Sequence, residues 1–530
     1  MKTIDHYLNA FKQDTISRRS FLKHTAQLGI SLSAAGMLLN SPKRALAGSQ
    51  TPRRGGTLKV AWQLASPNDT IDPMRTVGDL DTNRVMQLYN TLVSMSPDMK
   101  PMPALAESWE PVSGADDWVF HLRKGVEFHD GRPFTAKDVV YSINRVKDPK
   151  NGSGGAPLYA DIVELKAENK HTLRIKLQNP NADLPVLFSE YHGHIIPDEF
   201  TDFDHAVGTG PFKLKSFEPG VLCVTERNPN YFREGLPYVD RVETFAIPDK
   251  VARLNALLAG EIDLMARLDP RAVKRVEADP RAKVLATKAG LQIPFNMMCT
   301  KAPYDNPDVR TALKLLVDRE KYLKRVYKGY GQIGNDQPIA PIFPYYCDDL
   351  PIRQYDPDKA KALLKKAGYL DHTFELNASD GIYGSVEGAL IYSQMAAKAG
   401  VKVKPVRRPT DGYWDSVWMK EPFSAGNWNT RQTENMMLTI GYNSDAPWND
   451  TFWKRPAFDK LLLEARATVD DKKRTELYCA MQRMIHEDGG LLLPVFPDYL
   501  DAGSKKVHIT LHPMASLGGW NFHETAWKEA

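Results

Sequence analysis

Alternating hydrophobic and polar positions predict β-strands at several places in the chain. The stretch TLKVAW puts Leu58, Val60 and Trp62 on one face, because successive side chains of a strand point to opposite faces. The same period of two recurs in residues 118–128, WVFHLRKGVEF, and in residues 171–177, HTLRIKL. We expect each stretch to contribute a half-buried strand to a sheet.

Apolar residues spaced three and four apart predict amphipathic helices between and after the strands. One such helix has Asn306 as its cap and Pro307 in its first turn, and we expect it to run as far as Gly329. A second helix repeats these signals, with Asp356 at its start and Gly368 at its end. Helices of this kind cover sheets, so the pattern predicts an α/β or α+β fold class.

The N-terminal segment has the features of an export signal. Its apolar run, residues 28–39, is too short for a bilayer, which needs about 20 residues. The paired Arg18 and Arg19 before the run resemble a twin-arginine signal, and the Ala-Leu-Ala triplet that ends at Ala47 is typical of a cleavage site. We therefore predict that residues 1–47 are a twin-arginine signal peptide and that the mature protein is periplasmic.

Removal of this segment leaves a chain of nearly balanced charge. Residues 1–47 carry seven of the 69 Lys and Arg and two of the 65 Asp and Glu, so 62 basic and 63 acidic residues remain. A partner such as nucleic acid or a membrane surface would require a basic stripe, and we predict neither partner. The mature part, about 480 residues, exceeds what one hydrophobic core serves, so we expect two or more lobes.

The sequence lacks the local signatures of common enzymes and cofactor sites. It contains no G-x-S-x-G motif, no C-x-x-C pair and no lysine-bearing phosphate loop. His192 and His194 could share a metal, but no third ligand is spaced with them. We expect no cofactor, no metal and no catalytic residues. Disulfides and free thiols are equal alternatives for the four cysteines, Cys223, Cys299, Cys347 and Cys479.

Eight stretches, taken in order, resemble one protein family. They are RGGTLKVA, LAESWEP, WVFHLRKGVEFHDGRPFTAKDVVYS, GTGPFKLKSFEPG, RNPNYF, ALLAGEIDL, DVRTALKLLVDREK and YDPDKAKALLKKAGY. Together they are similar to the large periplasmic solute-binding proteins of peptide, nickel and opine ABC importers, known as family 5 of the extracellular binding proteins. The resemblance covers nearly the whole mature chain.

The resemblance implies a two-lobed α/β periplasmic binding protein, large and class II-like, with a subdomain inserted in the first lobe. Two segments are expected to cross between the lobes, near residues 291–297 and 491–499. The implied organisation is first lobe in 48–95, inserted subdomain in 96–210, first lobe again in 211–290, second lobe in 291–493 and a return to the first lobe in 494–530.

The resemblance also implies a function. A small peptide or similar zwitterionic solute is captured between the lobes, and the closed form then docks on permease subunits of an ABC importer in the inner membrane. We expect a monomer without enzymatic activity. An opine, an oligosaccharide, haem or chelated nickel stays open as the cargo of the same fold. A periplasmic hydrolase or redox enzyme is a further alternative, to which the twin-arginine signal points.

The run GYNSDAPWNDTFW, residues 441–453, carries four aromatic rings and two aspartates. In peptide-binding relatives an aspartate in a W-x-x-D-like strand end of the second lobe binds the ammonium group of the ligand. The resemblance places Asp445 in that role, with Tyr442 where the tryptophan would stand, and Asp450 is the alternative. A carboxylate in an aromatic-walled cleft would give a ligand ammonium a charge-assisted bond and cation-π contacts together.

Arg431 is our first candidate for binding a ligand carboxylate, because the planar guanidinium suits two-point binding. Arg407 and Arg408 are second candidates. Five of the ten tryptophans fall between residues 414 and 453, so aromatic walls are expected there, although plain core packing is the competing interpretation. The remaining site candidates are Trp428, Trp448, Tyr413, Trp414 and, at the first crossing, Asn296.

Overall fold

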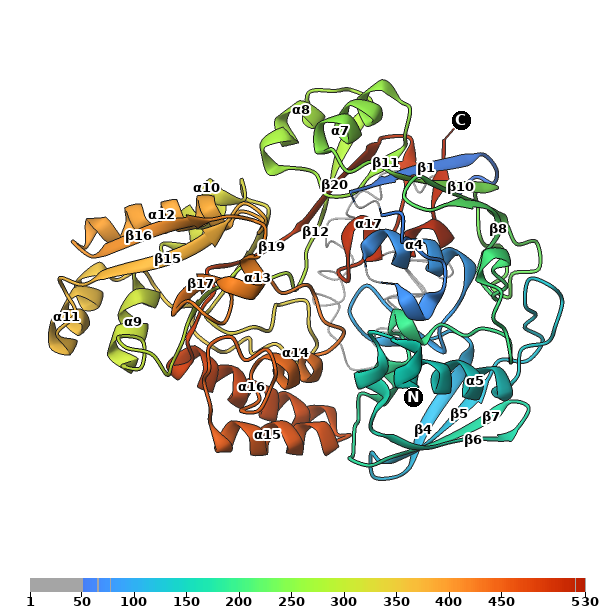
Figure 1. Cartoon of the computed structure of the whole chain (residues 1–530), viewed down its shortest axis with the longest axis horizontal. Coiled ribbons are helices and arrows are strands. Elements are labelled where there is room, and N and C mark those ends of the chain that lie inside the picture. The colour runs from blue at the N-terminus through green and yellow to red at the C-terminus, as the bar shows by residue number, and fades with distance from the viewer. Residues whose placement is uncertain (1–50, 64–65, 77, 520, 530) are drawn as a thin grey trace, which may run out of the picture. The chain divides into compact units, whose positions relative to one another are not determined.

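The computed structural model describes residues 51–530, except 64–65, 77, 520 and 530, and their elements gather into two lobes (Figure 1). The predicted signal peptide, residues 1–47, lies outside the described residues. The lobes contain three larger sheets. The boundaries between the sequence segments stay a prediction. No helix in the described part of the chain has the length and apolar character needed to cross a bilayer.

The first lobe is built on the largest sheet of the described residues, which has seven strands. Their order is β12 (Ala282–Thr287), β20 (Tyr499–Ser504), β11 (Leu264–Met265), β1 (Thr57–Trp62), β10 (Arg241–Ala246), β9 (Leu222–Arg227) and β8 (Phe212–Glu218). The sheet is mixed, because β1 is parallel to β10 and β11, whereas β20 is antiparallel to β11 and β12. Leu58, Val60 and Trp62 of β1 are buried, which confirms the predicted strand. The helices that contact this sheet are α4 (Asp79–Leu88), α7 (Lys250–Ala259), α8 (Val273–Glu277) and α17 (Ser516–Gly519).

A four-stranded antiparallel sheet lies beside this core. Its order is β4 (Ala106–Ser113), β5 (Asp117–Leu122), β7 (Thr172–Leu177) and β6 (Ile162–Asn169). Trp118, Phe120 and Leu122 of β5 alternate with more exposed residues and are buried, as the period of two predicts. Helix α5 (Ala136–Lys147) packs on this sheet. Helix α6 (Leu184–Leu187) follows β7 in the chain.

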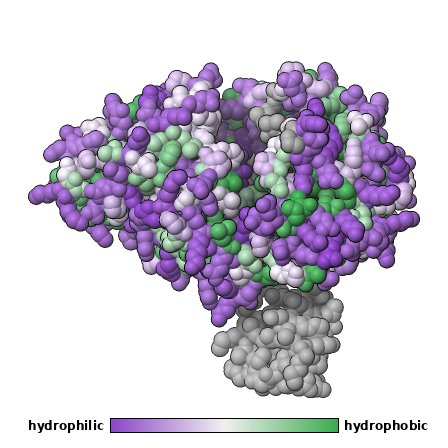
Figure 2. All heavy atoms as spheres, turned by 60° about the horizontal axis from the view of Figure 1, so that its bottom comes forward, coloured by the Kyte–Doolittle hydropathy of each residue, from purple (hydrophilic) through white to green (hydrophobic). Residues whose placement is uncertain are grey.

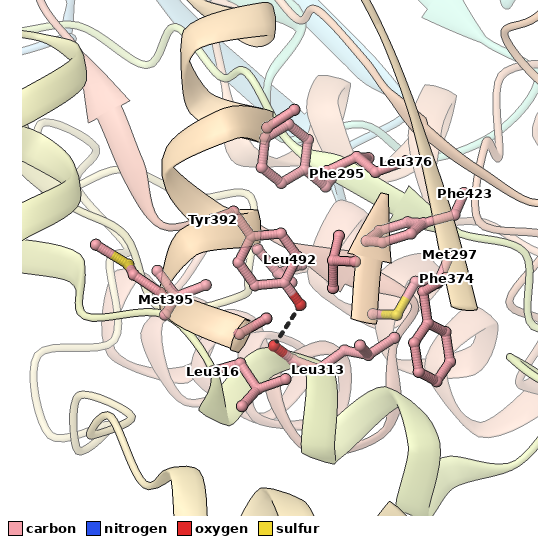
Figure 3. Close-up of a cluster of buried hydrophobic side chains, with 14 of the residues drawn as sticks. Phe295, Met297, Leu313, Leu316, Phe374, Leu376, Tyr392, Met395, Phe423 and Leu492 are labelled. Atoms are coloured by element: carbon pink, nitrogen blue, oxygen red, sulfur yellow. Dashed lines mark hydrogen bonds between the residues drawn. The ribbon is translucent and has the colours of Figure 1, made fainter. Parts of the chain in front are cut away.

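The second lobe is built on a five-stranded sheet in the order β16 (Lys402–Arg408), β15 (Thr373–Ser379), β17 (Phe423–Ala425), β13 (Phe295–Met297) and β18 (Leu491–Leu492). Phe295 of this sheet stacks on Tyr392 and meets Phe423 edge-on, and the hydroxyl of Tyr392 donates to the carbonyl of Leu313 at 2.9 Å (Figure 3). The helices of the lobe are α9 (Pro307–Leu315), α10 (Arg319–Val326), α11 (Pro357–Ala367), α12 (Ser385–Lys398), α13 (Tyr413–Ser416), α14 (Glu434–Gly441), α15 (Pro456–Ala467) and α16 (Asp471–Asp488).

The predicted single helix from Asn306 to Gly329 is wrong, because the structure has two helices there. Asn306 caps α9 as expected, but α9 ends at Leu315. Asp318 then accepts a hydrogen bond from the backbone N–H of Lys321 and starts α10, so a second cap competes with continuation of the first helix. The other predicted helix is confirmed as α11, capped at its two ends by Asp356 and by Gly368 in the left-handed region.

Short strand pairs and one disulfide complete the described part. The pairs are β2 (Val93–Met95) with β3 (Pro101–Pro103), β14 (Gly331–Ile333) with β19 (Val495–Pro497), and β21 (Val507–His508) with β22 (Trp527–Lys528). Cys347 and Cys479 form a disulfide that joins the segment after β14 to α16. Cys223 and Cys299 are free thiols, so one of the pairings left open by the sequence is realised.

Candidate functional site

Two large cavities among the described residues are each lined by residues of both lobes. The first, here the Arg431 cavity, has a volume of 430 Å³ and is lined by residues that include Asp79, Glu190, Tyr191, Arg431, Trp448 and Tyr499. The second, here the Asp498 cavity, has a volume of 750 Å³ and is lined by residues that include Arg267, Asp269, Tyr383, Arg407, Asp498 and Tyr499. Both fall within the range of small-molecule pockets, about 300–1,000 Å³. The largely hydrophilic face in Figure 2 is hollowed between the two lobes.

Arg431 brings an unneutralised positive charge to the first cavity. No hydrogen bond or ion pair to its guanidinium is found among the described residues, and its Nε is buried without a partner. The guanidinium carbon lies 5.6 Å from the ring centre of Trp428 and 5.9 Å from that of Trp448, so it packs on both indoles. Burial lowers the pKa of Arg431, but a guanidinium starts so high that it stays charged. Such a group can bind an anion of a ligand.

The acidic side chains opposite Arg431 are already paired. Glu190 lies 2.9 Å from Nδ1 of His192, and Asp79 accepts a hydrogen bond from Arg267 at 3.2 Å. Burial lowers the pKa of His192, but the hydrogen bond with Glu190 and the charge of that residue outweigh burial and raise it. Both ring nitrogens of His192 are engaged, since Nε2 lies 3.2 Å from the carbonyl oxygen of Thr76. These pairs therefore leave Arg431 available to a ligand.

Asp450 holds the indole rings of Trp428 and Trp418 in place through hydrogen bonds. One of its carboxylate oxygens accepts hydrogen bonds from Asn296 at 2.7 Å, from Trp428 at 3.1 Å and from Trp418 at 3.2 Å. The residue is buried, and burial raises the pKa of its carboxyl to about 7. Tyr442 is also buried near Asp450, whose charge adds to the effect of burial in raising the pKa of the tyrosine. Asp450 and Asn296 thus position Trp428 and line neither of the two cavities.

The other aromatic candidates are divided between the cleft and the core. Trp448 is 45% exposed, packs edge-on against Trp428 at 6.0 Å and lines the Arg431 cavity. Tyr413 lies in the core of the second lobe, where its hydroxyl donates to the carbonyl of Ala425 at 2.9 Å. Trp414 packs edge-on against Tyr413 and lines neither cavity. Core packing, the competing interpretation, accounts for Tyr413.

The expected setting of Asp445 differs from the observed one. Asp445 was expected at a strand end, but it follows helix α14, and its side chain is 95% exposed with Lys454 at 3.7 Å. The strand that leads to the cleft is β17, and the W-x-x-D spacing after it falls on Trp428 and Arg431. The fourth position is therefore an arginine, and the charge offered to a ligand at this strand end is reversed.

Arg407 and Arg408, the second candidates for a ligand carboxylate, have partners in the second lobe. Arg407 forms an ion pair with Asp380 at the edge of the Asp498 cavity. Arg408 donates to the side-chain oxygen of Asn377 at 2.7 Å and pairs with Glu421 at 3.2 Å. A paired arginine offers less to a ligand than Arg431 does.

Asp498 is the site residue that the sequence analysis missed. It lies between β19 and β20 in the second crossing segment, and its carboxylate lines the larger cavity. The available signal was an aspartate inside an otherwise apolar crossing, LLLPVFPDY, where a charge without a cationic neighbour in the sequence is unusual.

The described residues offer few potential ligands for a metal ion. The one close trio of possible ligands is Cys347, Asp349 and Cys479, and the two sulfurs are joined in a disulfide. Both ring nitrogens of His192 already have partners, Glu190 and the carbonyl of Thr76, and His194 directs Nδ1 to the carbonyl of Tyr191. The trio therefore offers a metal one carboxylate and no thiolate.

Comparison with known proteins identifies the family and the fold. Residues 100–454 match the family model described as the middle region of bacterial extracellular solute-binding proteins, family 5. Di/tripeptide-binding protein 2 of Pseudomonas aeruginosa is 29% identical over 85% of this chain and 91% of its own length. Heme-binding protein A of Haemophilus influenzae is 30% identical over 76% of this chain and 80% of its own length.

Solved structures show the same architecture. The periplasmic binding protein DppA of Helicobacter pylori, in complex with the peptide STSA, aligns with a TM-score of 0.72 and 25% identity over 90% of this chain and 99% of that chain. The substrate-binding protein CtaP of Listeria monocytogenes aligns with a TM-score of 0.80 and 20% identity over 90% of this chain and 100% of that chain, which shows the fold alone. The chain therefore belongs to family 5 of the bacterial extracellular solute-binding proteins.

Proposed function

We propose that this protein captures a small peptide or a similar zwitterionic solute between its lobes and delivers it to the permease subunits of an ABC importer in the inner membrane. Proteins of family 5 are periplasmic solute-binding components of such importers, which supports the role. The protein acts as a monomer and does not turn over its ligand. Residues 1–47 direct its export by the twin-arginine route.

The observation that carries this proposal is the position of Arg431. It is a charged side chain in a cavity shared by both lobes, it packs on two indole rings, and no ion pair to it is found among the described residues. A carboxylate that enters the cavity would gain a two-point, charge-assisted bond without breaking an existing ion pair. A peptide C-terminus has this chemistry.

The relatives support a peptide more than other cargo. One curated relative is a di/tripeptide-binding protein, several are glutathione-binding proteins, and one structural neighbour holds the peptide STSA. Haem remains the second candidate, because heme-binding protein A is 30% identical and haem carries two propionates that Arg431 could bind. An opine, an oligosaccharide and chelated nickel stay open as further alternatives.

Titration calorimetry with trialanine and trialanine amide tests the proposal. We expect trialanine to bind and the amide to bind about 10-fold more weakly or worse, because the amide removes the charge that pairs with Arg431. Arg431→Met should abolish this preference, whereas Arg281→Met should keep it, since Arg281 is exposed and lines neither cavity. Equal affinity of wild type and Arg431→Met for trialanine would contradict the proposal. Haem, an opine, a trisaccharide and nickel-histidine are titrated in parallel, and recovery of intact trialanine by mass spectrometry checks that it is not hydrolysed.

A further inference from the structure

Asp498 is a buried acidic side chain in the cleft to which the proposed function assigns no role. The residue is 8% exposed and lines the Asp498 cavity. Its Oδ1 is buried, and no hydrogen-bond partner for that atom is found in the described part of the chain. A carboxylate held in this way costs folding free energy, because water has been removed from it and nothing replaces the lost bonds.

The arginines that line the same cavity already have partners. The pairs are Arg267 with Asp79, Arg271 with Asp269 and Arg407 with Asp380, and Arg253 donates to the carbonyls of Ile247 and Ala266. The one lysine whose charge acts on Asp498, Lys288, is exposed and forms no ion pair with it within the described residues. Burial outweighs Lys288 and raises the pKa of Asp498 to about 6. The carboxylate therefore has no cation of its own within the protein's described part.

Asp498 and Arg431 are the chain neighbours of Tyr499 and Thr430, two residues that contact each other between the lobes. Tyr499 follows Asp498 in the chain and lines both cavities. Its hydroxyl lies 3.4 Å from Oγ1 of Thr430, the residue before Arg431. The two unneutralised charges, which have opposite signs, thus stand in neighbouring cavities that share the Tyr499 side chain.

The surroundings of Asp498 suit an organic cation. Tyr383 and Tyr499 line the same cavity as Asp498, and the guanidinium carbon of Arg267 lies 5.0 Å from the ring centre of Tyr499. An ammonium or guanidinium group beside Asp498 would gain a charge-assisted hydrogen bond and could also contact the ring of Tyr383.

We propose that Asp498 binds the cationic group of the cargo while Arg431 binds its carboxylate. The cargo is then an extended zwitterion, in which a chain that passes Tyr499 separates the two charges. A short peptide with a free N-terminus belongs to this class, whereas a single α-amino acid, with both charges on one carbon, does not. This inference rests on the proposed function, because it requires Arg431 to bind the carboxylate end.

Calorimetry with trialanine and N-acetyl-trialanine on the full mature protein tests the role of Asp498. We expect N-acetylation and Asp498→Asn each to weaken binding by about 10-fold or more, because each removes one partner of a buried charge pair. The two losses should not add, since both remove the same contact, so the variant should scarcely distinguish the two peptides. Asp371→Asn is the matched control, because Asp371 is exposed and lines neither cavity. Thermal unfolding of each variant verifies that it is folded.

The outcomes separate this inference from the proposed function. If trialanine binds, depends on Arg431 and tolerates both N-acetylation and Asp498→Asn, the role of Asp498 is overturned and the proposed function stands. If trialanine does not bind the wild type, the peptide cargo fails, and native mass spectrometry of freshly exported protein decides the role of Asp498. A bound adduct that disappears in Asp498→Asn supports the role; an adduct retained at the wild-type level, or bare protein in both samples, overturns it.

Discussion

Asp336 and Asp498 are both buried aspartates, but their surroundings differ. Asp336 accepts hydrogen bonds from Arg319 at 2.6 Å and from Arg353 at 2.9 Å inside the second lobe. Burial raises the pKa of Asp336, yet the two arginines outweigh burial and hold that pKa below its usual range. At Asp498 no described arginine or lysine pairs with the carboxylate, and burial raises its pKa to about 6.

The same contrast holds for the arginines. Arg319 and Arg353 are tied to Asp336, whereas the guanidinium of Arg431 has no hydrogen-bond partner among the described residues. A satisfied buried charge belongs to the framework of the fold, because its removal strands its partners. A buried charge without a partner lowers the stability of the fold, and a ligand group of opposite charge can offset that loss. Arg431 and Asp498 therefore differ from the Asp336 cluster in having no ion-pair partner among the described residues.

Removal of Asp336 should have the largest effect on stability. Asp336→Ala leaves the buried Arg319 and the half-buried Arg353 without their anion, which should lower the free energy of unfolding by roughly 3–5 kcal/mol. Urea unfolding measures the loss, and Asp371→Ala serves as the exposed control. A loss no greater than that of the control would mean that this buried cluster does not stabilise the fold.

Arg431→Met should weaken binding and spare the fold. Methionine can keep the contact with Trp428 and Trp448, and no described ion pair is broken, so the free energy of unfolding should stay within about 0.5 kcal/mol of wild type. Trialanine binding should nevertheless weaken by roughly 2–5 kcal/mol. Arg319→Met is the counterpart and should lose stability, because it leaves Asp336 with one arginine fewer. If Arg431→Met and Arg319→Met lowered the free energy of unfolding equally, the proposed difference between Arg431 in the cleft and Arg319 in the core would be wrong.

Asp450 sharpens the comparison, because it is buried with hydrogen bonds but has no cationic partner among the described residues. Burial raises its pKa to about 7 from 3.8, so between these values the folded state keeps a proton that the unfolded chain has released. The contribution of Asp450 to stability is therefore present at low pH and declines as pH rises through this window, by up to roughly 1.4 kcal/mol per pH unit. Asp450→Asn keeps an acceptor oxygen and cannot titrate, so its stability should fall less between pH 4 and pH 7. Urea unfolding measures the free energy of unfolding at each pH. An equal fall for wild type and variant between pH 4 and pH 7 would contradict this account.

Asp445→Asn should have the smallest effect. The side chain is 95% exposed, so both stability and trialanine binding should stay within about 0.5 kcal/mol of wild type. The resemblance of GYNSD to a W-x-x-D strand end instead predicts a loss of about 10-fold in affinity. Calorimetry on this variant decides between the two, and a 10-fold loss would return Asp445 to the site.

Short-range signals in the sequence predicted individual elements well. Alternation in β1 and β5 and the caps at Asn306, Asp356 and Gly368 depend on neighbours within a few residues, so they can be read without knowledge of the fold. The break between α9 and α10 was missed because apolar spacing continues through it. Only the side chain of Asp318, which accepts from the backbone of the next turn, marks the restart.

The candidate site could be predicted in part. The sequence identified the aromatic-rich segment and Arg431, and the structure places Arg431 and Trp448 in one cavity. The sequence analysis assigned the W-x-x-D strand end to residues 442–445. No local pattern distinguishes these residues from residues 428–431, which follow β17. The sheet makes the distinction, since β17 pairs with β13 and β15 in the second lobe.

The sequence by itself determined strands β1 and β5, the caps at Asn306, Asp356 and Gly368, the two-lobed family fold and the nearly balanced charge of residues 48–530. Tertiary structure decided which buried charges have partners, because those partners come from distant segments. Asp336 meets Arg319 and Arg353 across loops, and Tyr499 meets Thr430 across 69 positions of the chain. Whether a charge is satisfied depends on distances of a few ångströms between such segments, which no local pattern encodes. The unpaired atoms of Arg431 and Asp498 therefore became visible only when the lobes were assembled.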